Sequence, residues 1–281
     1  MTDQQQMTQR LERARQAGPG ALAQACAALL AEARGVDSAA AARAVGHDRA
    51  LAGLIAEAAP AARLAACLAD LARAKRCLGC ATCCRASSPT LYAEDLPRLK
   101  AVGLGWESLV TLRAGERVHS ARLGGLQTLE RELIKLRERG GSCAWLGGGG
   151  CRIYEQRPLQ CRWLECWSGR HAGQLEERPR LSRAELLADD PTALALAKEY
   201  EVKLPAEALH QALAQVARGR DQAPALSLLE LDHHLRQAIA ERYGYRPQAL
   251  YLVLGRPAVE VAANYGLELS LKGVSPVLRS R

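Results

Sequence analysis

The sequence predicts a mainly α-helical protein, with α+β character confined to a small β-hairpin inside a cysteine-rich module that lies between two helical regions. Three observations predict this fold class. Ala, Leu and Arg dominate a chain in which aromatic residues make up only 4% and Phe is absent, and this composition favours helices with cores of small aliphatic side chains. Gly, Pro and Asp divide the apolar stretches into helix-sized pieces. Eight of the ten cysteines fall within residues 77–166.

The N-terminal part of the chain has the pattern of several short helices. Residues 4–16 form a charged amphipathic segment that a Gly-Pro-Gly break ends. The Ala- and Leu-rich stretch 21–75 contains three further breaks. We therefore expect three or four helices in that stretch, with Asp37 or Ser38 and Asp48 as N-caps.

The middle of the chain combines predicted helices with one hairpin. An acidic pair ahead of Pro97 suits the first turn of a helix. The leucine spacing of residues 126–139 predicts an amphipathic helix that two glycines end. Residues 142–154 place four consecutive glycines between two β-favourable pieces, which predicts a hairpin whose turn brings Cys143 and Cys151 together.

Helices dominate the remainder of the chain. Pro158 suits the first position of a helix that carries Cys161 and Cys166. Residues 249–254 are compatible with either a helix or a strand. Further helices are predicted near 181–188, 191–199, 205–218, 227–243, 247–254 and 257–265.

These patterns divide the chain into four regions. They are a mobile N-terminal end at 1–20, a helical region at 21–75, a cysteine-cluster metal-binding domain at 76–170 and a C-terminal helical region at 171–281. The N-terminus lacks the basic, apolar and small-residue order of a signal peptide, and no apolar run reaches the roughly 18 residues of a membrane span. We therefore expect a cytoplasmic protein with no membrane partner.

The segment Cys77-Leu-Gly-Cys80-Ala-Thr-Cys83-Cys84 places four thiols in eight residues. In the reducing cytoplasm, closely spaced thiols are typical of metal ligands or redox groups rather than of disulfides. Thiolates select soft or borderline metals, and CxxC spacing lets two sulfurs converge on one ion or cluster. If the segment is helical, all four thiols share one arc of about 120°. A loop could converge them as well.

The cysteine spacing leaves two metals open. The C-x2-C-x2-C beginning of bacterial ferredoxins is present, but the C-x3-C-P continuation is absent. Structural zinc sites usually present two separated CxxC halves, whereas the second group of cysteines in this chain is spaced by 8, 10 and 5 residues. Cys26 and Cys67 lie on apolar helices without a close cysteine or histidine partner, so we interpret them as small core residues.

Three groups of residues together resemble a known family. They are Cys77-x2-Cys80-x2-Cys83-Cys84, the segment Leu91-x3-Asp95-Leu96-x-Arg98-Leu99, and the run from Cys143 to Arg162 that reads CAWLGGGGCRIYEQRPLQCR. This pattern is similar to that of the YkgJ-type cysteine-cluster (CxxCxxCC) proteins over residues 77 to about 167. The resemblance implies a zinc- or iron-chelating domain. Some relatives are flagellin lysine methylases, in which this domain resembles an iron–sulfur module.

The resemblance also implies a ligand set. The metal-ligand candidates are Cys77, Cys80, Cys83, Cys84, Cys143, Cys151 and Cys161, with Cys166 as the eighth. Eight thiolates could hold two four-sulfur sites, or one site with spare redox cysteines. Arg152, Arg157 and Arg162 are either donors of charge-assisted hydrogen bonds to the sulfurs of a bound cofactor or surface residues. The implied cofactor is an iron–sulfur cluster, of the [4Fe–4S] type, or zinc.

The net charge of +8 is concentrated in the cysteine segment. Residues 75–170 carry 16 basic and 9 acidic side chains, so they account for +7 of the total. A zinc or [4Fe–4S] site with four thiolates is itself an anion of about −2, and such sites would offset much of this excess. No basic run interleaved with aromatic residues is present, and this disfavours a nucleic-acid surface.

Three functions stay open from the sequence. The first is a metal-binding protein whose cysteine module serves structure, electron transfer or metal handling, with a metal ion or cluster as its partner and room for a protein partner. The second is a group-transfer enzyme related to the methylases, although no nucleotide or dinucleotide fingerprint is present. The third is a zinc-organised nucleic-acid binder. We interpret Asp232-His233-His234 as a solvated helix face.

Overall fold

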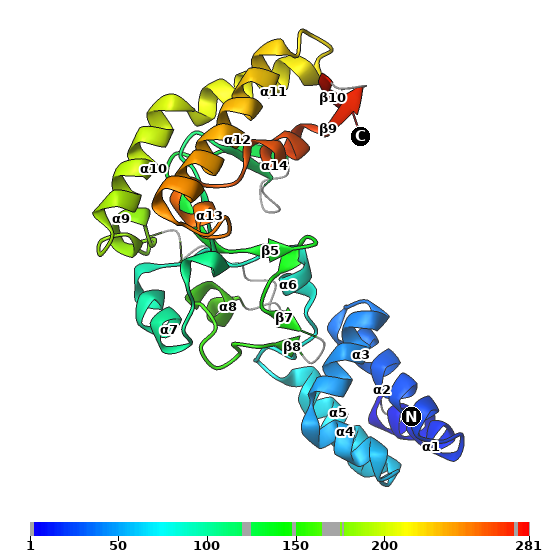
Figure 1. Ribbon diagram of the computed structural model, residues 1–281. Coiled ribbons are helices and arrows are strands. Elements are labelled where there is room, and N and C mark those ends of the chain that lie inside the picture. Colours follow the sequence, from blue (N-terminus) through cyan, green and yellow to red (C-terminus); the bar gives the residue numbers. More distant parts are fainter. Residues whose placement is uncertain are drawn as a thin grey trace. The chain divides into compact units, whose positions relative to one another are not determined.

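The chain folds into two compact units. A computed structural model describes residues 3–119, 125–147, 150–164, 175, 177–272 and 275–280. Unit 1 consists of Met1–Ser88 and Glu138–Glu177, and unit 2 of Pro89–Arg137 and Arg178–Arg281. Helices make up most of both units, and the described strands form two-stranded antiparallel sheets (Figure 1). This arrangement confirms the mainly α fold class, and the four-region division of the chain stays a prediction.

Five helices begin unit 1 and are drawn from blue to cyan in Figure 1. They are α1 (Asp3–Gln16), α2 (Pro19–Arg34), α3 (Ser38–His47), α4 (Arg49–Ala56) and α5 (Ala61–Arg73). Their core consists of leucine and alanine side chains, as the composition predicts. Asp37 accepts a hydrogen bond from the backbone N–H of Ala40, and Asp48 accepts one from Leu51. Both predicted N-caps are therefore confirmed. Cys26 is fully buried in this core.

The cysteine module, defined here as residues 77–88, 138–147 and 150–164, completes the described part of unit 1 apart from a few flanking residues. Its elements are very short. They are α6 (Thr82–Ala86), β5 (Glu138–Arg139), β6 (Ser142–Cys143), β7 (Leu146–Gly147), β8 (Gly150–Cys151) and α8 (Leu159–Trp163). β5 pairs with β6 and β7 pairs with β8, each over two residue pairs. The helix predicted to begin at Pro158 is present, with Pro158 as its N-cap, and it carries Cys161. It ends at Trp163, before Cys166, so the prediction that it also carries Cys166 is wrong.

The predicted hairpin is present, but it does not pair the two cysteines. Leu146 is the partner of Cys151 across the β7–β8 ladder, whereas Cys143 faces Glu138 in the β5–β6 ladder. A second turn at Gly140 and Gly141, both with positive φ, separates β5 from β6. The sequence suggested one hairpin around the four glycines, and the structure has two.

The helix predicted for residues 126–139 is wrong. That segment forms β3 (Leu126–Thr128), β4 (Leu133–Leu136) and β5. In β4 the fully buried side chains of Ile134 and Leu136 alternate with partly exposed neighbours, which is the two-residue period of a strand. β4 pairs in antiparallel register with β1 (Leu109–Leu112), which is buried at every position. Pairing with a distant strand has overridden a local pattern that also fits a helix.

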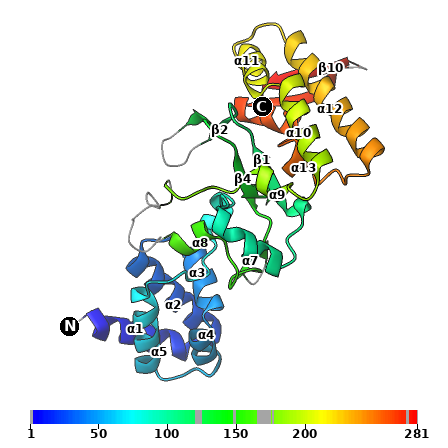
Figure 2. The same cartoon turned by 90° about the vertical axis from the view of Figure 1, so that its left-hand side faces the viewer.

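Unit 2 is built from helices and three two-stranded ladders. α13 packs against β1, and α10 packs against α13 (Figure 2). Its remaining elements are η1 (Ala93–Asp95), α7 (Leu96–Ala101), η2 (Trp106–Ser108), β2 (Arg117–His119), α9 (Arg183–Leu186), α10 (Pro191–Lys203), α11 (Ala206–Ala217), α12 (Ala223–Tyr243), α13 (Leu250–Val253), α14 (Ala258–Ala262), η4 (Ala263–Tyr265), β9 (Leu267–Lys272) and β10 (Ser275–Ser280). β2 pairs with β3, and β9 pairs with β10. None of the helices in the described part of the chain combines the length and apolar character needed to cross a bilayer.

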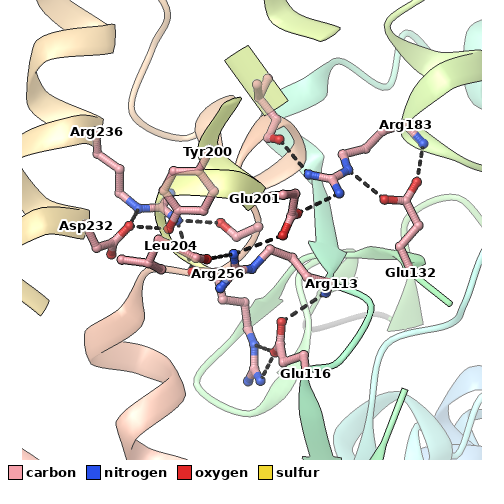
Figure 3. Close-up of polar contacts among 12 residues, drawn as sticks. Arg113, Glu116, Glu132, Arg183, Tyr200, Glu201, Leu204, Asp232, Arg236 and Arg256 are labelled. Carbon is pink, nitrogen blue, oxygen red and sulfur yellow. Dashed lines mark hydrogen bonds and ion pairs between the residues drawn. The ribbon is translucent and has the colours of Figure 1, made fainter. Parts of the chain in front are cut away.

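A network of charged side chains lies in the interior of unit 2 (Figure 3). Arg113 is only 2% exposed, and its guanidinium donates to Glu201 at 3.2 Å and to the carbonyl of Leu204 at 2.7 Å. Arg183 donates to Glu132 at 2.7 Å and to Glu201 at 2.8 Å. Each of these arginines therefore has at least one carboxylate partner within the same unit, as buried cations require.

Asp232 forms the second half of this network. Its carboxylate accepts hydrogen bonds from the Tyr200 hydroxyl at 2.5 Å, from Arg236 Nε at 2.7 Å and from the backbone N–H of Ala258 at 2.6 Å. Asp232 is only 3% exposed. The interpretation of Asp232-His233-His234 as a solvated face is therefore wrong for Asp232, although both neighbouring histidines are exposed.

Candidate metal centre

The first group of cysteines lies on an irregular loop that leads into α6. Gly79 and Ala81 both adopt a left-handed backbone with φ of 70° and 61°. These two residues turn the chain sharply between Cys77 and the start of the helix. Only Cys83 and Cys84 of this group are helical, so the four thiols are brought together by a loop rather than by one helix face.

The second group of cysteines comes from three short elements of the same unit. Cys143 lies on β6 and is 8% exposed, Cys151 ends β8, and Cys161 lies in the middle of α8. α6 packs against β6, which brings the helix that carries Cys83 next to the strand that carries Cys143. Cys166 lies outside the described residues.

The electrostatic effects of the cysteines on one another show that the two groups meet. Burial raises the pKa values of Cys77, Cys143, Cys151 and Cys161, and the nearby Cys83 sulfur raises each of them further. Cys83 and Cys84 are the closest pair, with their sulfurs 4.0 Å apart. A hydrogen bond from the Cys84 thiol holds the pKa of Cys83 below its usual value. Cys83 is thus the common neighbour of thiols from every segment of the module.

The thiols are neighbours but are not arranged around a single centre. Among the residues that the structure describes, no three histidine, cysteine, aspartate or glutamate side chains are arranged to hold a metal ion. Cys77 Sγ accepts a hydrogen bond from the N–H of Gly79 at 3.4 Å, and Cys80 Sγ lies 3.5 Å from Thr82 Oγ1. Binding of a metal by this set therefore requires rotation of the side chains toward a common point, which staggered cysteine rotamers allow.

The three predicted cofactor-binding arginines have different surroundings. The Arg157 guanidinium stacks on the Tyr154 ring at 4.0 Å and lowers the pKa values of Cys77, Cys151 and Cys161, although burial dominates all three. Arg152 is exposed and lies 5.4 Å from the Trp145 ring, with a hydrogen bond to the carbonyl of Ala144. Arg162 is on α8 beside Cys161. Arg157 is the one placed near thiols of both cysteine groups.

The chemistry of the module fits a thiolate-bound metal or an iron–sulfur group. Its donor set consists of soft sulfur ligands. The Nε atom of Arg157 and the Nε1 atom of Trp145 are also buried and have no hydrogen-bond partner among the described residues. Both atoms are N–H donors, and buried donors ordinarily have an acceptor. Metal-bound thiolates or cluster sulfides are acceptors of that kind.

Two residues near the thiols were not singled out from the sequence. Trp145 appeared only as a letter of the family pattern. His47 lies at the end of α3, and its ring packs against Gly79 and Gly150, one glycine from each cysteine group. No motif marks His47, because it precedes the first ligand candidate by a whole helical region. The one available signal was the presence of glycines next to cysteines, which indicates a close approach of some other group.

Comparison with protein families identifies the cysteine segment. Residues 76–181 match the family described as "CxxCxxCC: Putative zinc- or iron-chelating domain". The resemblance inferred from the sequence is confirmed. No curated protein and no solved structure matches the chain. The CxxCxxCC match begins at the loop that carries Cys77 and includes residues 89–137, which belong to unit 2. It leaves out helices α1 to α5 and almost all of the C-terminal region.

Proposed function

We propose that the CxxCxxCC segment binds a metal centre whose main role is structural, with cysteine thiolates holding together a module that lacks a core of its own. The proposed ligands are drawn from Cys77, Cys80, Cys83, Cys84, Cys143, Cys151, Cys161 and Cys166. An iron–sulfur cluster is the form we favour, and zinc is the alternative. The enzyme and nucleic-acid hypotheses stay predictions.

The observation that carries this proposal is the small apolar interior of the cysteine module. Its buried aliphatic side chains among the residues described are only five: Leu78, Ala81, Ile153, Pro158 and Leu159. Leu78 belongs to the core of the N-terminal helices. Two-residue ladders and five-residue helices are too short to be stable alone. Small domains with so little core normally need a metal or disulfides.

Metal binding can supply the missing stability. A structural thiolate site contributes on the order of 10 kcal/mol of folding free energy, because the ligands are not assembled in the unfolded chain. The ligand candidates of the described residues come from both chain segments of unit 1, at residues 77–84 and 143–161. Between these segments the chain passes through residues 89–137, which belong to unit 2. A centre that binds thiolates from both portions closes this long loop, which is where a cross-link has most effect.

The buried N–H donors favour a cluster over a single ion. Trp145 Nε1 and Arg157 Nε have no acceptor among the described residues. A zinc ion offers only its thiolates as acceptors, whereas an iron–sulfur cluster adds inorganic sulfides, and hydrogen bonds to these sulfurs set cluster properties. The Arg157 guanidinium also offsets part of the negative charge that either centre carries.

Anaerobic purification followed by analysis of iron, acid-labile sulfide and zinc tests the proposal. The wild type should carry iron with sulfide and absorb visible light through thiolate-to-iron charge transfer. Cys83→Ser and Cys161→Ser should lose the metal. Cys67→Ser is the matched control, because Cys67 is partly buried on α5 against the helical core, and it should retain the metal.

The outcomes separate the parts of the proposal. Stoichiometric zinc without sulfide would show that the thiolate site holds zinc rather than an iron–sulfur cluster. A wild-type protein without either metal would contradict the proposal, and so would full metal content in both Cys83→Ser and Cys161→Ser.

A further inference from the structure

The N-terminal helices hold the first ligand loop from one side. Leu78 is 7% exposed and belongs to the core of α1 to α5, and Cys80 packs against the same core. Arg43 on α3 donates from Nε to the carbonyl oxygen of Cys80 at 2.7 Å. Arg76 forms an ion pair with Asp48 at 2.9 Å. The loop from residue 76 to residue 80 is therefore attached to α3 and to the start of α4.

His47 is exposed, but its ring lies directly against the backbone of two glycines. A Cβ atom at Gly79 would lie 2.2 Å from His47 Cδ2, which is far inside van der Waals contact. A Cβ atom at Gly150 would lie 3.1 Å from His47 Cε1. Gly79 stands between Cys77 and Cys80, and Gly150 directly precedes Cys151. One side chain thus touches the backbone beside ligand candidates of both cysteine groups.

Two further side chains extend this contact toward the thiols. The rings of His47 and Tyr154 are 6.2 Å apart, and the Tyr154 hydroxyl donates to the carbonyl of Cys77 at 3.3 Å. Arg157 covers the same Tyr154 ring at 4.0 Å and donates to the Tyr154 carbonyl at 2.7 Å. His47 therefore ends a row of three packed side chains that runs along Cys77.

We propose that His47 is a positioning residue of the metal centre: its ring sets the spacing between the loop that carries Cys77 and Cys80 and the hairpin that carries Cys151. The inference rests on the proposed metal binding. It assigns a role in that site to the N-terminal helices, which lie outside the matched segment 76–181. Ligand orientation by neighbours of this kind typically changes metal affinity 10- to 100-fold, and a similar factor is expected here.

Competitive titration with Zn²⁺ against a chelator, and absorption spectra of the Co²⁺-loaded protein, test the role of His47. We expect His47→Ala to bind Zn²⁺ about tenfold more weakly or worse and to change the Co²⁺ spectrum, because the sulfurs no longer hold one geometry. Gly46→Ala is the matched control. Gly46 is the preceding residue of α3, is exposed, and has open space where a Cβ would lie. It should bind like the wild type.

A double-mutant cycle with Gly79→Ala measures the contact itself. In the wild type the added methyl group collides with the ring, and in His47→Ala there is no ring to meet. The left-handed backbone of Gly79 penalises alanine equally in both backgrounds. Gly79→Ala should therefore weaken Zn²⁺ binding more in the wild type than in the His47→Ala background. His47→Gln restores part of the side-chain volume and should bind Zn²⁺ with intermediate affinity. If His47→Ala does not fold, the Zn²⁺ affinity of His47→Gln tests the positioning role instead.

Each result bears on one proposal. Wild-type protein that carries no iron–sulfur cluster and binds neither Zn²⁺ nor Co²⁺ would overturn the metal function. Wild-type binding together with equal affinity and spectra in His47→Ala and Gly46→Ala would overturn the positioning role alone, as would an equal effect of Gly79→Ala in both backgrounds. If only His47→Gln folds, wild-type affinity and spectra in that variant would overturn the role as well.

Discussion

The two units bury polar groups in different ways. In unit 2 the cations Arg113, Arg183 and Arg236 each meet a carboxylate of the same unit, so that this network is closed by protein groups (Figure 3). In the cysteine module of unit 1, the buried N–H donors of Trp145 and Arg157 lack an acceptor among the residues that the structure describes, and the neighbouring thiols raise one another's pKa values. The folded chain therefore satisfies the charged network of unit 2 by itself, whereas the module has the composition of a site that a metal completes.

The largest single-residue effect on unit 2 should come from breaking its closed network. Asp232→Asn removes the charge that faces Arg236, a cation on the same helix, and leaves that cation buried without a full partner. We expect a loss of about 3–5 kcal/mol in the free energy of unfolding of unit 2, measured by urea denaturation. Metal content should stay at the wild-type level, because the proposed ligands belong to unit 1.

Glu199→Gln provides the matched control for that variant. Glu199 forms an ion pair with Lys203 at 2.8 Å on the exposed face of α10, and exposed pairs of this kind contribute little. The midpoint of unfolding should not change measurably. An equal loss of unfolding free energy in both variants would mean that the buried Asp232 network stabilises unit 2 no more than an exposed ion pair does.

A smaller effect is expected from pH. Burial lowers the pKa of His210 from 6.5 to about 4, and neutral His210 accepts a hydrogen bond at Nε2 from the N–H of Arg117. The unfolded chain binds a proton on this histidine below pH 6.5, whereas the folded chain does so only near pH 4. Stability is therefore complete above about pH 6.5 and is lost as the pH falls toward 4, by about 3 kcal/mol in all.

Urea unfolding of unit 2 at pH 7 and at pH 4.5 measures this loss. His210→Gln keeps an acceptor but does not titrate, so its stability should change less between the two conditions. The groups that surround His210 include Glu116, Arg113, Arg117 and Arg256. If the variant loses as much stability as the wild type on acidification, these neighbours rather than His210 cause the pH dependence.

The smallest effect is expected at the N-cap of α3 in unit 1. Asp37→Ala removes the N-cap of α3, where Asp37 accepts from the N–H of Ala40 at 2.7 Å. The expected cost is about 1 kcal/mol of stability in the N-terminal helices, visible as a lower unfolding temperature of unit 1 in calorimetry. A shift of the unit 2 transition by the same amount would show that the two units unfold together and do not have separate stabilities.

The sequence predicted the features that depend on local chemistry. The caps at Asp37 and Asp48, the first-turn proline of α7 and the core position of Cys26 each follow from a residue and its near neighbours. The CxxCxxCC pattern was readable for the same reason. The prediction of a helix at residues 126–139 was wrong because Ile134 and Leu136 are buried by pairing with β1, about 25 residues away. The spacing of the apolar residues in this segment fits the period of a helix as well as that of a strand.

The features that escaped the sequence depend on distant contacts. His47 meets Gly79 and Gly150 only after α3 has docked on the module. Arg113 and Arg183 stand in no sequence motif, and the carboxylate of Glu201, which both contact, lies 88 and 18 residues away in the chain. No local pattern distinguishes an arginine that will be buried beside a carboxylate from one that stays in water.

Amide hydrogen exchange shows whether the metal holds the cysteine module together. It is followed by mass spectrometry on the metal-loaded protein and after removal of the metal with a chelator under reducing conditions. Amides of residues 77–88, 138–147 and 150–164 should lose most of their protection when the metal is removed, while residues 89–119, 125–137 and 178–272 keep theirs. Equal protection of the cysteine module with and without metal would contradict a structural role of the metal.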